Sequence, residues 1–142
     1  MSTAPVRYET EMPQVFELLG RVEAAIASSP LDGLLRHLVK LRVSQINQCA
    51  HCVKMHLAEA RADGETTARL DRLVVWSQVS DFSPAEQSAL AWAEALTVID
   101  HRTDLGALRA TLRAHFSDEE ITGLTAAIAM INLWNRFQIS RH

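Results

Sequence analysis

Both cysteines of this chain lie in one short segment together with two of its six histidines, Cys49-Ala50-His51-Cys52-Val53-Lys54-Met55-His56. Apolar residues recur on both sides of this segment, and no proline interrupts residues 31–70, which predicts helix. At about 100° per residue, Cys49, Cys52 and His56 fall within an arc of about 60° on such a helix, whereas His51 points away. The spacing therefore predicts a dithiol with a histidine beside it on one helix face.

The chemistry of this pair depends on how readily a thiol ionises. A thiol with a pKa near 8.5 is only about 3 % thiolate at neutral pH, whereas a pKa near 6.5 gives about 75 %. Asn47 is a residue type favoured at an N-cap, and as the cap it would leave Cys49 and Cys52 in the first turns, where free backbone N–H groups favour an anion. His56, one turn beyond Cys52, is placed to accept its proton.

A disulfide between the two cysteines is expected to require local unwinding of the helix. Helical neighbours three residues apart have Cβ atoms about 5–6 Å apart, whereas a relaxed disulfide needs about 3.5–4.5 Å. Strained disulfides are easily reduced, and they are typical of catalytic or regulatory sites. The segment therefore indicates a redox-active pair.

Two other uses of the same residues stay open. Cys49, Cys52 and His56 supply three possible zinc ligands, with His37 or His51 as the fourth. Structural zinc usually links loops, whereas this apolar pattern is able to fold without metal, so we expect neither metal nor cofactor. A redox sensor that switches a partner interface is the second alternative. A purely structural disulfide is disfavoured, because two cysteines do not make a secreted disulfide framework.

The composition predicts a single all-α domain. Hydrophobic residues make up 48 % of the 142 positions and aromatic residues only 6 %, which suits Ala- and Leu-rich helices. We expect one domain over residues 1–142, with its core at about 31–138 and with about six to seven helices. The expected helices, bounded by caps such as Asp63-Gly64 and by the capping boxes at Ser83 and Ser117, are 13–29, 31–46, the cysteine helix, 66–76, 84–98, 105–115 and 121–138. The last is apolar on nearly all sides and is expected to be buried centrally or between subunits.

Charge and hydropathy exclude several classes of partner. The formal net charge of −3 gives no electrostatic footprint for nucleic acid. No apolar run approaches the length of a membrane span, and residues 1–12 lack the apolar core of a signal peptide. A cytoplasmic, reducing location is therefore expected, in which the pair would rest as a dithiol.

Several motifs together resemble the alkylhydroperoxidase D-like proteins of the carboxymuconolactone decarboxylase family. They cover most of the chain from about Leu31 onward, and they are the run 38–47, the segment 49–56, and the runs 82–86, 91–97 and 131–136. The resemblance implies an all-helical homo-trimer or homo-hexamer. It also implies an antioxidant oxidoreductase, a thiol-dependent peroxidase that reduces hydroperoxides and is recharged by a lipoyl or thioredoxin-like dithiol donor. Some relatives without the cysteine pair are lactone decarboxylases.

The resemblance also assigns roles to individual residues. In the family, protons pass through the histidine that matches His56 to the second cysteine, here Cys52. Because His56 lies one turn from Cys52, we expect Cys52 to attack the peroxide and Cys49 to be its resolving partner. The family places a glutamate twelve positions before the first cysteine, where this chain has His37. A histidine that is neutral near pH 7 does not stabilise protonated His56 as a carboxylate does.

This departure leaves three alternatives. The proton relay is weaker, another acid such as Glu94 or Glu59 takes over, or the peroxidase activity is lost. We expect structural roles for the remaining residues that draw attention: Trp92, Trp134 and Phe137 in core or interface packing, His51 at the surface or a subunit contact, and Glu94 with Arg136 as a pair across helices.

Overall fold

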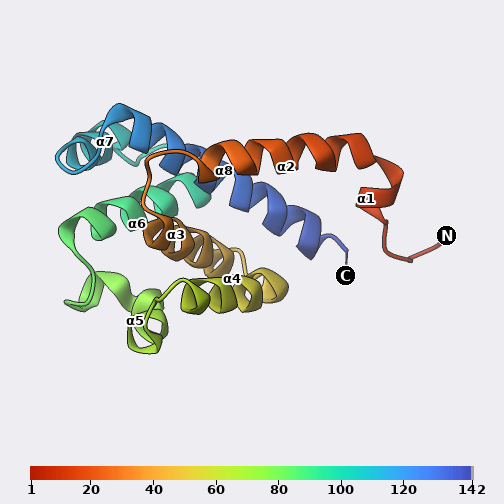
Figure 1. The fold of residues 1–142 in the computed structure, drawn as a ribbon, viewed down its shortest axis with the longest axis horizontal. Helices are drawn as coiled ribbons and strands as arrows, with labels where there is room; N and C mark the ends of the chain where they lie inside the picture. Colours follow the sequence, from red (N-terminus) through yellow and green to blue (C-terminus); the bar gives the residue numbers. More distant parts are fainter. Residues whose placement is uncertain (142) are drawn as a thin grey trace.

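The computed structural model describes residues 1–141, which contain eight α-helices, one 3₁₀-helix and no strand (Figure 1). The all-α prediction is therefore confirmed. Two short elements raise the helix count above the expected six to seven. One is a single turn near the N-terminus, and the other is a 3₁₀ segment, because the expected helix 66–76 is an α-helix only over its first part. The elements are α1 (Tyr8–Glu11), α2 (Pro13–Ala27), α3 (Gly33–Ile46), α4 (Ala50–Ala62), α5 (Thr67–Arg72), η1 (Leu73–Gln78), α6 (Pro84–Thr97), α7 (Leu105–Arg113) and α8 (Asp118–Ile139).

Local cap chemistry fixes the helix boundaries that matter most for the site. Ser83 and Ser117 each form a complete capping box. α6 therefore begins at Pro84, as predicted, whereas α8 begins at Asp118, directly after its cap and three residues before the expected start at 121. Just beyond α4, Gly64 adopts a φ of 99°, a conformation that glycine reaches without the steric cost that a side chain would impose. The predicted stop near Asp63-Gly64 is thus confirmed.

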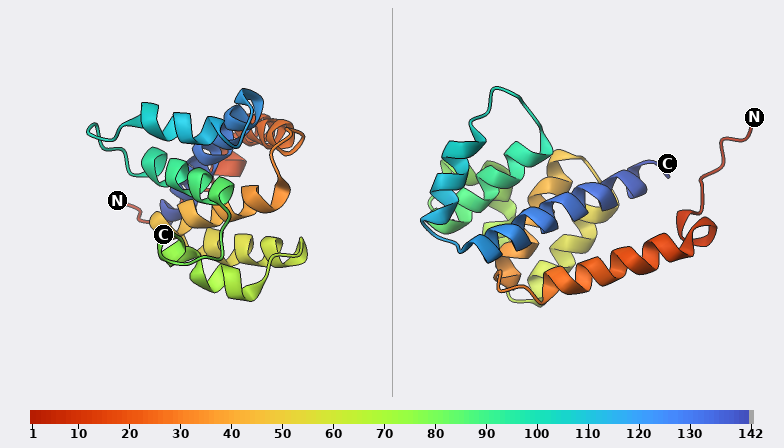
Figure 2. Two further views of the ribbon diagram at one scale, coloured as in Figure 1. Left: turned by 90° about the vertical axis from the view of Figure 1, so that its left-hand side faces the viewer. Right: turned by 90° about the horizontal axis from the view of Figure 1, so that it is seen from above.

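Helix α3 is the centre of the molecule and packs against α4, α6 and α8 (Figures 1 and 2). It has apolar side chains on two faces. Val39 and Val43 join a core cluster built with α6, α7 and α8, whereas Leu38 and Leu41 join a second cluster with α4, α5 and η1. All four are fully buried, so α3 separates two halves of the core and holds its C-terminal end, which leads into the cysteines, in place.

Helix α8 crosses the molecule (Figure 2). Helix α2 runs along the edge of the molecule, and α1 lies at the outer end of α2 (Figure 2). α2 packs against α8. The last turn of α8 is tied to the N-terminal segment, because the ring of Phe137 lies 5.1 Å from that of Tyr8 and 5.0 Å from that of Phe16. None of the helices among residues 1–141 is both long enough and apolar enough to cross a membrane.

Candidate redox site

The turn between α3 and α4 places the cysteines differently from the prediction. Asn47 is the C-cap of α3 and not the N-cap of the cysteine helix. Gln48 follows with a φ of 56°, and Cys49 is then the N-cap of α4, with extended backbone and its Sγ accepting the N–H of Cys52 at 3.4 Å. The prediction for Asn47 is wrong because its amide is used elsewhere: Nδ2 donates to Oδ1 of Asn132 and of Asn135, at 2.9 Å each.

Cys49 and Cys52 are joined in a disulfide, with their Cα atoms 5.3 Å apart. Because Cys49 precedes the first residue of α4 and has extended backbone, the bond forms at the helix end. The prediction that both cysteines lie within one helix is therefore wrong, and the bond closes where the backbone is no longer helical. Both residues are almost fully buried, at 2 % and 1 % exposure. Since this pair accounts for both cysteines of the chain, the described structure holds no free thiol.

The buried His56 lies one turn along α4 from Cys52 and contacts a carboxylate. Its Nδ1 lies 2.9 Å from Oε2 of Glu59, whereas its Nε2 is buried and has no hydrogen-bond partner within residues 1–141. A carboxylate at Nδ1 favours the tautomer that carries its proton there, which leaves Nε2 as an acceptor. Burial lowers the pKa of His56 below its ordinary value of 6.5, and the bond to Glu59 opposes part of this decrease. The ring is therefore neutral near pH 7 and able to take up a proton.

Of the two acids suggested as substitutes for the family glutamate, only Glu59 lies at the site. Glu94 instead accepts hydrogen bonds from Arg42 Nε and Trp76 Nε1, at 2.8 Å each. The expected pair of Glu94 with Arg136 is wrong, because Arg136 bonds to the Asn132 carbonyl and side chain.

His37 lies beside this pair and not directly at His56. Its Nε2 is 2.6 Å from Oδ2 of Asp63, and its Nδ1 is 3.9 Å from Oε2 of Glu59. Asp63, His37, Glu59 and His56 therefore form a row of side chains that runs from the exposed end of α4 inward. In this row His37 contacts the acid that holds His56.

A cavity of about 230 Å³, here called the Cys52 pocket, reaches Cys52 and His56. Among the lining residues without a functional signal in the sequence, Glu23, Lys40 and Trp134 are joined by hydrogen bonds. Glu23 of α2 bridges the other two: its Oε2 lies 3.3 Å from Lys40 Nζ, and its Oε1 accepts the Trp134 Nε1–H at 2.8 Å. They were missed because they come from three helices that only the fold brings together. The lining residues are Glu23, Lys40, His51, Cys52, Met55, His56, Glu59, Ile131, Trp134 and Gln138.

The remaining aromatic and histidine expectations are met in part. Trp92 is buried in the core, and its Nε1 donates to Thr125 Oγ1. Trp134 packs against the core, as expected, but it also forms a wall of the Cys52 pocket. His51 is exposed at the rim of this pocket.

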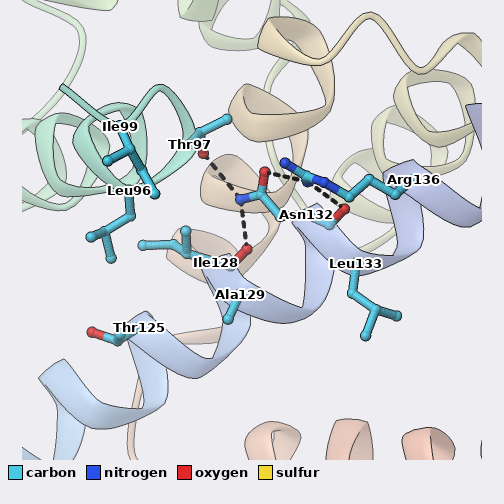
Figure 3. A pocket seen from close by; sticks show the side chains of 9 residues that line it. All are labelled: Leu96, Thr97, Ile99, Thr125, Ile128, Ala129, Asn132, Leu133 and Arg136. Carbon is cyan, nitrogen blue, oxygen red and sulfur yellow. Dashed lines mark hydrogen bonds between the residues drawn. The ribbon is translucent and has the colours of Figure 1, made fainter.

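A second, larger cavity lies away from the cysteines, between the end of α6 and the outer face of α8 (Figure 3). It has a volume of about 430 Å³, and its lining includes Leu96, Ile99 and Leu133. Asn132 stands at its centre, donating to Thr97 Oγ1 and the Ile128 carbonyl and accepting from Arg136 (Figure 3). Since Asn132 also accepts from Asn47, this face of α8 is connected to the turn that carries the cysteines.

The zinc alternative requires Cys49, Cys52, His56 and a fourth ligand to converge on one point. No group of three or more His, Cys, Asp or Glu side chains among residues 1–141 is arranged to hold a metal ion. The two cysteines bond to each other, and His37, one candidate for the fourth ligand, is engaged with Asp63.

Comparisons with known proteins agree on the family and on the fold. Residues 13–95 match the model of the carboxymuconolactone decarboxylase family. The chain is 34 % identical over 135 residues to the uncharacterized protein YdfG of Bacillus subtilis (strain 168), covering 95 % of this chain and 92 % of that protein.

Solved structures of other proteins have a similar fold. Protein ATU0492 of Agrobacterium tumefaciens, provisionally named antioxidant defence protein AhpD, superposes with a TM-score of 0.90 at 37 % identity, over 98 % of this chain and 95 % of that one. The debrominase Bmp8 shares the fold alone, with a TM-score of 0.82 at 18 % identity over 93 % of this chain and 71 % of that one. With its cysteine turn, its helical fold and these matches, the chain belongs to the carboxymuconolactone decarboxylase family, and it has the AhpD-like fold.

Proposed function

We propose that this protein is a thiol-dependent peroxidase that reduces hydroperoxides through Cys52 and Cys49. The observation that carries the proposal is the cysteine pair at the start of α4, joined as a disulfide beside a buried histidine whose Nε2 is free to accept a proton. A peroxidatic thiol needs a base nearby to reach its reactive thiolate form. The provisional name of the A. tumefaciens relative, which refers to antioxidant defence, supports the same activity.

In the proposed oxidation, each bond and proton has a place. His56 Nε2 accepts the proton of the Cys52 thiol, and the thiolate attacks one oxygen of the peroxide. The O–O bond breaks, Cys52 becomes a sulfenic acid, and the leaving alkoxide takes the proton from His56 to give the alcohol. The Cys49 thiol then attacks the Cys52 sulfur, water leaves, and the disulfide forms.

Glu59 is the carboxylate that supports His56 in this scheme. It holds Nδ1 at 2.9 Å and favours the charged imidazolium that forms when Nε2 is protonated. It therefore does what the family glutamate does, from one turn along α4 instead of from α3. His37 takes the glutamate's place in the sequence but acts through Glu59, as a positioning residue.

The partners of the reaction follow from the same proposal. A dithiol donor, either a lipoyl group or a thioredoxin-like protein, reduces the disulfide, and a reducing cytoplasm is the compartment in which such donors regenerate the dithiol. We also propose that the chain works as a homo-trimer or homo-hexamer.

The proposal is tested with single cysteine variants of the purified protein. Cys52→Ser is expected to abolish peroxide consumption with a dithiol present, whereas Cys49→Ser is expected to leave a sulfenic acid that a dimedone-type reagent traps on Cys52. Sulfenic acid that forms in Cys52→Ser but not in Cys49→Ser would reverse the two roles. A wild-type chain that forms the disulfide once but does not turn over with dithiols would favour the redox sensor instead.

A further inference from the structure

A third cavity reaches the disulfide at Cys49. This Cys49 pocket has a volume of about 240 Å³ and is lined by Gln48, Cys49, Ala50, His51, Gln138 and Ile139. Cys52 lines the first pocket and Cys49 lines this one. His51 and Gln138 border both, so these two side chains form the partition between the two openings.

The two pockets differ in charge. The Cys52 pocket contains Glu23, Lys40 and Glu59 as well as His56. Among the described residues that line the Cys49 pocket there is no Asp, Glu, Lys or Arg, and its polar groups are two Gln side chains and His51. An uncharged ligand loses less hydration on entering a neutral pocket than an ion does.

The geometry points to the Cys49 pocket as the port for the reductant, and to its ligand as an uncharged thiol. This inference rests on the proposed function and assigns each half of the cycle its own entrance: the hydroperoxide reaches Cys52 through one pocket, and the reductant thiol reaches Cys49 through the other. Because each cysteine is almost fully buried, the pocket that it lines is its route to solvent.

The chemistry of the exchange favours attack on Cys49. The reductant enters the pocket as a neutral thiol. Its sulfur loses its proton as it forms a bond to Cys49 Sγ, the Cys49–Cys52 bond breaks, and the electron pair of that bond leaves on Cys52. Cys52 takes up a proton in the pocket that holds His56, which eases its departure. The second thiol of a dithiol donor then attacks its own bound sulfur and releases Cys49 as a thiol. The two protons that the dithiol loses balance the two that the cysteines gain.

The site of attack can be mapped directly. The oxidised wild-type protein is mixed with excess 2-mercaptoethanol, quenched early with iodoacetamide, and digested. Fragmentation of the peptide is expected to place the mercaptoethanol adduct on Cys49 and the alkyl group on Cys52. The reverse placement would overturn the inference. In the same assay, the anionic analogue 2-mercaptoethanesulfonate is expected to react more slowly, and equal or faster reaction would contradict the assignment of an uncharged ligand.

Two matched substitutions separate the ports. Ile139→Trp adds bulk to the Cys49 pocket, and Met55→Trp adds bulk to the Cys52 pocket; both native side chains are apolar, and they are similarly exposed. Ile139→Trp is expected to slow reduction of the disulfide by dithiothreitol about tenfold more than it slows oxidation of the dithiol by tert-butyl hydroperoxide, and Met55→Trp is expected to do the opposite. Effects in the same half-reaction from both variants would overturn the two-port inference.

These experiments distinguish a failure of the proposed function from a failure of the two-port inference. If peroxide fails to oxidise the reduced wild-type chain, the peroxidase proposal fails. The adduct mapping and the effect of Ile139→Trp on reduction still decide whether thiols enter at Cys49, because neither measurement involves peroxide.

Discussion

At the scale of single residues, the site depends on what surrounds the imidazole of His56. Burial lowers its pKa, and the positive charge of Lys40 and the nearby His37 act in the same direction. Glu59 raises it, both through its hydrogen bond and through its charge. These effects leave a histidine that is neutral near pH 7 and that keeps one carboxylate to stabilise its protonated form. Glu59 is thus the group that decides how good a base His56 is.

Glu59→Gln is expected to lower the rate at which peroxide oxidises the reduced protein by about 10- to 100-fold. His56 accepts a proton only when it is neutral, so the rate falls as the pH drops through the pKa of His56. Loss of the carboxylate lowers that pKa further, because Glu59 raises it. The acid limb of the rate profile should therefore move to lower pH while the plateau falls. Stopped-flow measurement of the oxidation rate between pH 4 and 8 checks both effects, in the range where a histidine titrates.

Asp63→Asn is the matched control for this experiment. Asp63 lies at the outer end of the same row and contacts His37, not His56. Its loss is expected to leave the acid limb in place. An acid limb that stays put in Glu59→Gln, or that moves to higher pH, would show that Glu59 does not act on His56.

At the scale of the elements, the turn between α3 and α4 is held by amide side chains from α8. Asn135 is fully buried: its Oδ1 accepts from Asn47 Nδ2 at 2.9 Å, and its Nδ2 donates to Ser44 Oγ at 3.1 Å. A buried polar group lowers stability unless it forms hydrogen bonds, and here the side chains of Asn47, Asn135 and Ser44 supply these bonds to one another. This network connects the end of α3 to α8 immediately before the cysteines.

Asn135→Ala is expected to lower the free energy of unfolding by about 1–3 kcal/mol, since it removes two buried hydrogen bonds and leaves Ser44 without a donor. Urea denaturation measures the loss, and hydrogen exchange at residues 47–49 is expected to become faster. Gln138→Ala on the same helix, outside the network, should change the free energy of unfolding by no more than about 0.5 kcal/mol. Equal effects from both variants would mean that the network does not hold the turn.

The elements also show where sequence patterns suffice and where they fail. Ser83 and Ser117 start helices as predicted, because a capping box is local chemistry within four residues. The prediction for Asn47 was wrong because an asparagine suits either end of a helix. Its hydrogen bonds to α8 determine which end it occupies, and they depend on the tertiary fold. Cys49, Cys52 and His56 lie together because their spacing is local. Glu59 was one of two candidate acids, and only the fold separates it from Glu94.

At the scale of the whole molecule, apolar surface remains exposed beside the larger cavity. Val98, the C-cap of α6, is 63 % exposed, and Ile99, which lines that cavity (Figure 3), is 74 % exposed. Exposed apolar side chains next to an apolar cavity are typical of an interaction surface. This surface supports the proposal that the chain associates with copies of itself.

Static light scattering is expected to give a mass that is a multiple of the 15.8 kDa chain at micromolar concentration. Ile99→Asp should lower that mass, since it places a charge in the proposed contact. Ile99→Val keeps the surface apolar and serves as the control. A wild-type mass of a single chain would rule out the homo-oligomer.

Helix α8 has two parts along its length, one that packs in the core and one that borders the openings to the disulfide. Leu124 and Ile128 are buried in the core, whereas Trp134, Gln138 and Ile139, about two to three turns further on, border the openings to the disulfide. Residues in the first part are constrained by packing, and those in the second chiefly by the molecules that must pass them. Change in what the protein accepts can therefore accumulate at the end of one helix while the rest of that helix stays fixed. Substitution is thus tolerated at the few positions that border the openings, and it is costly at the buried positions of the same helix.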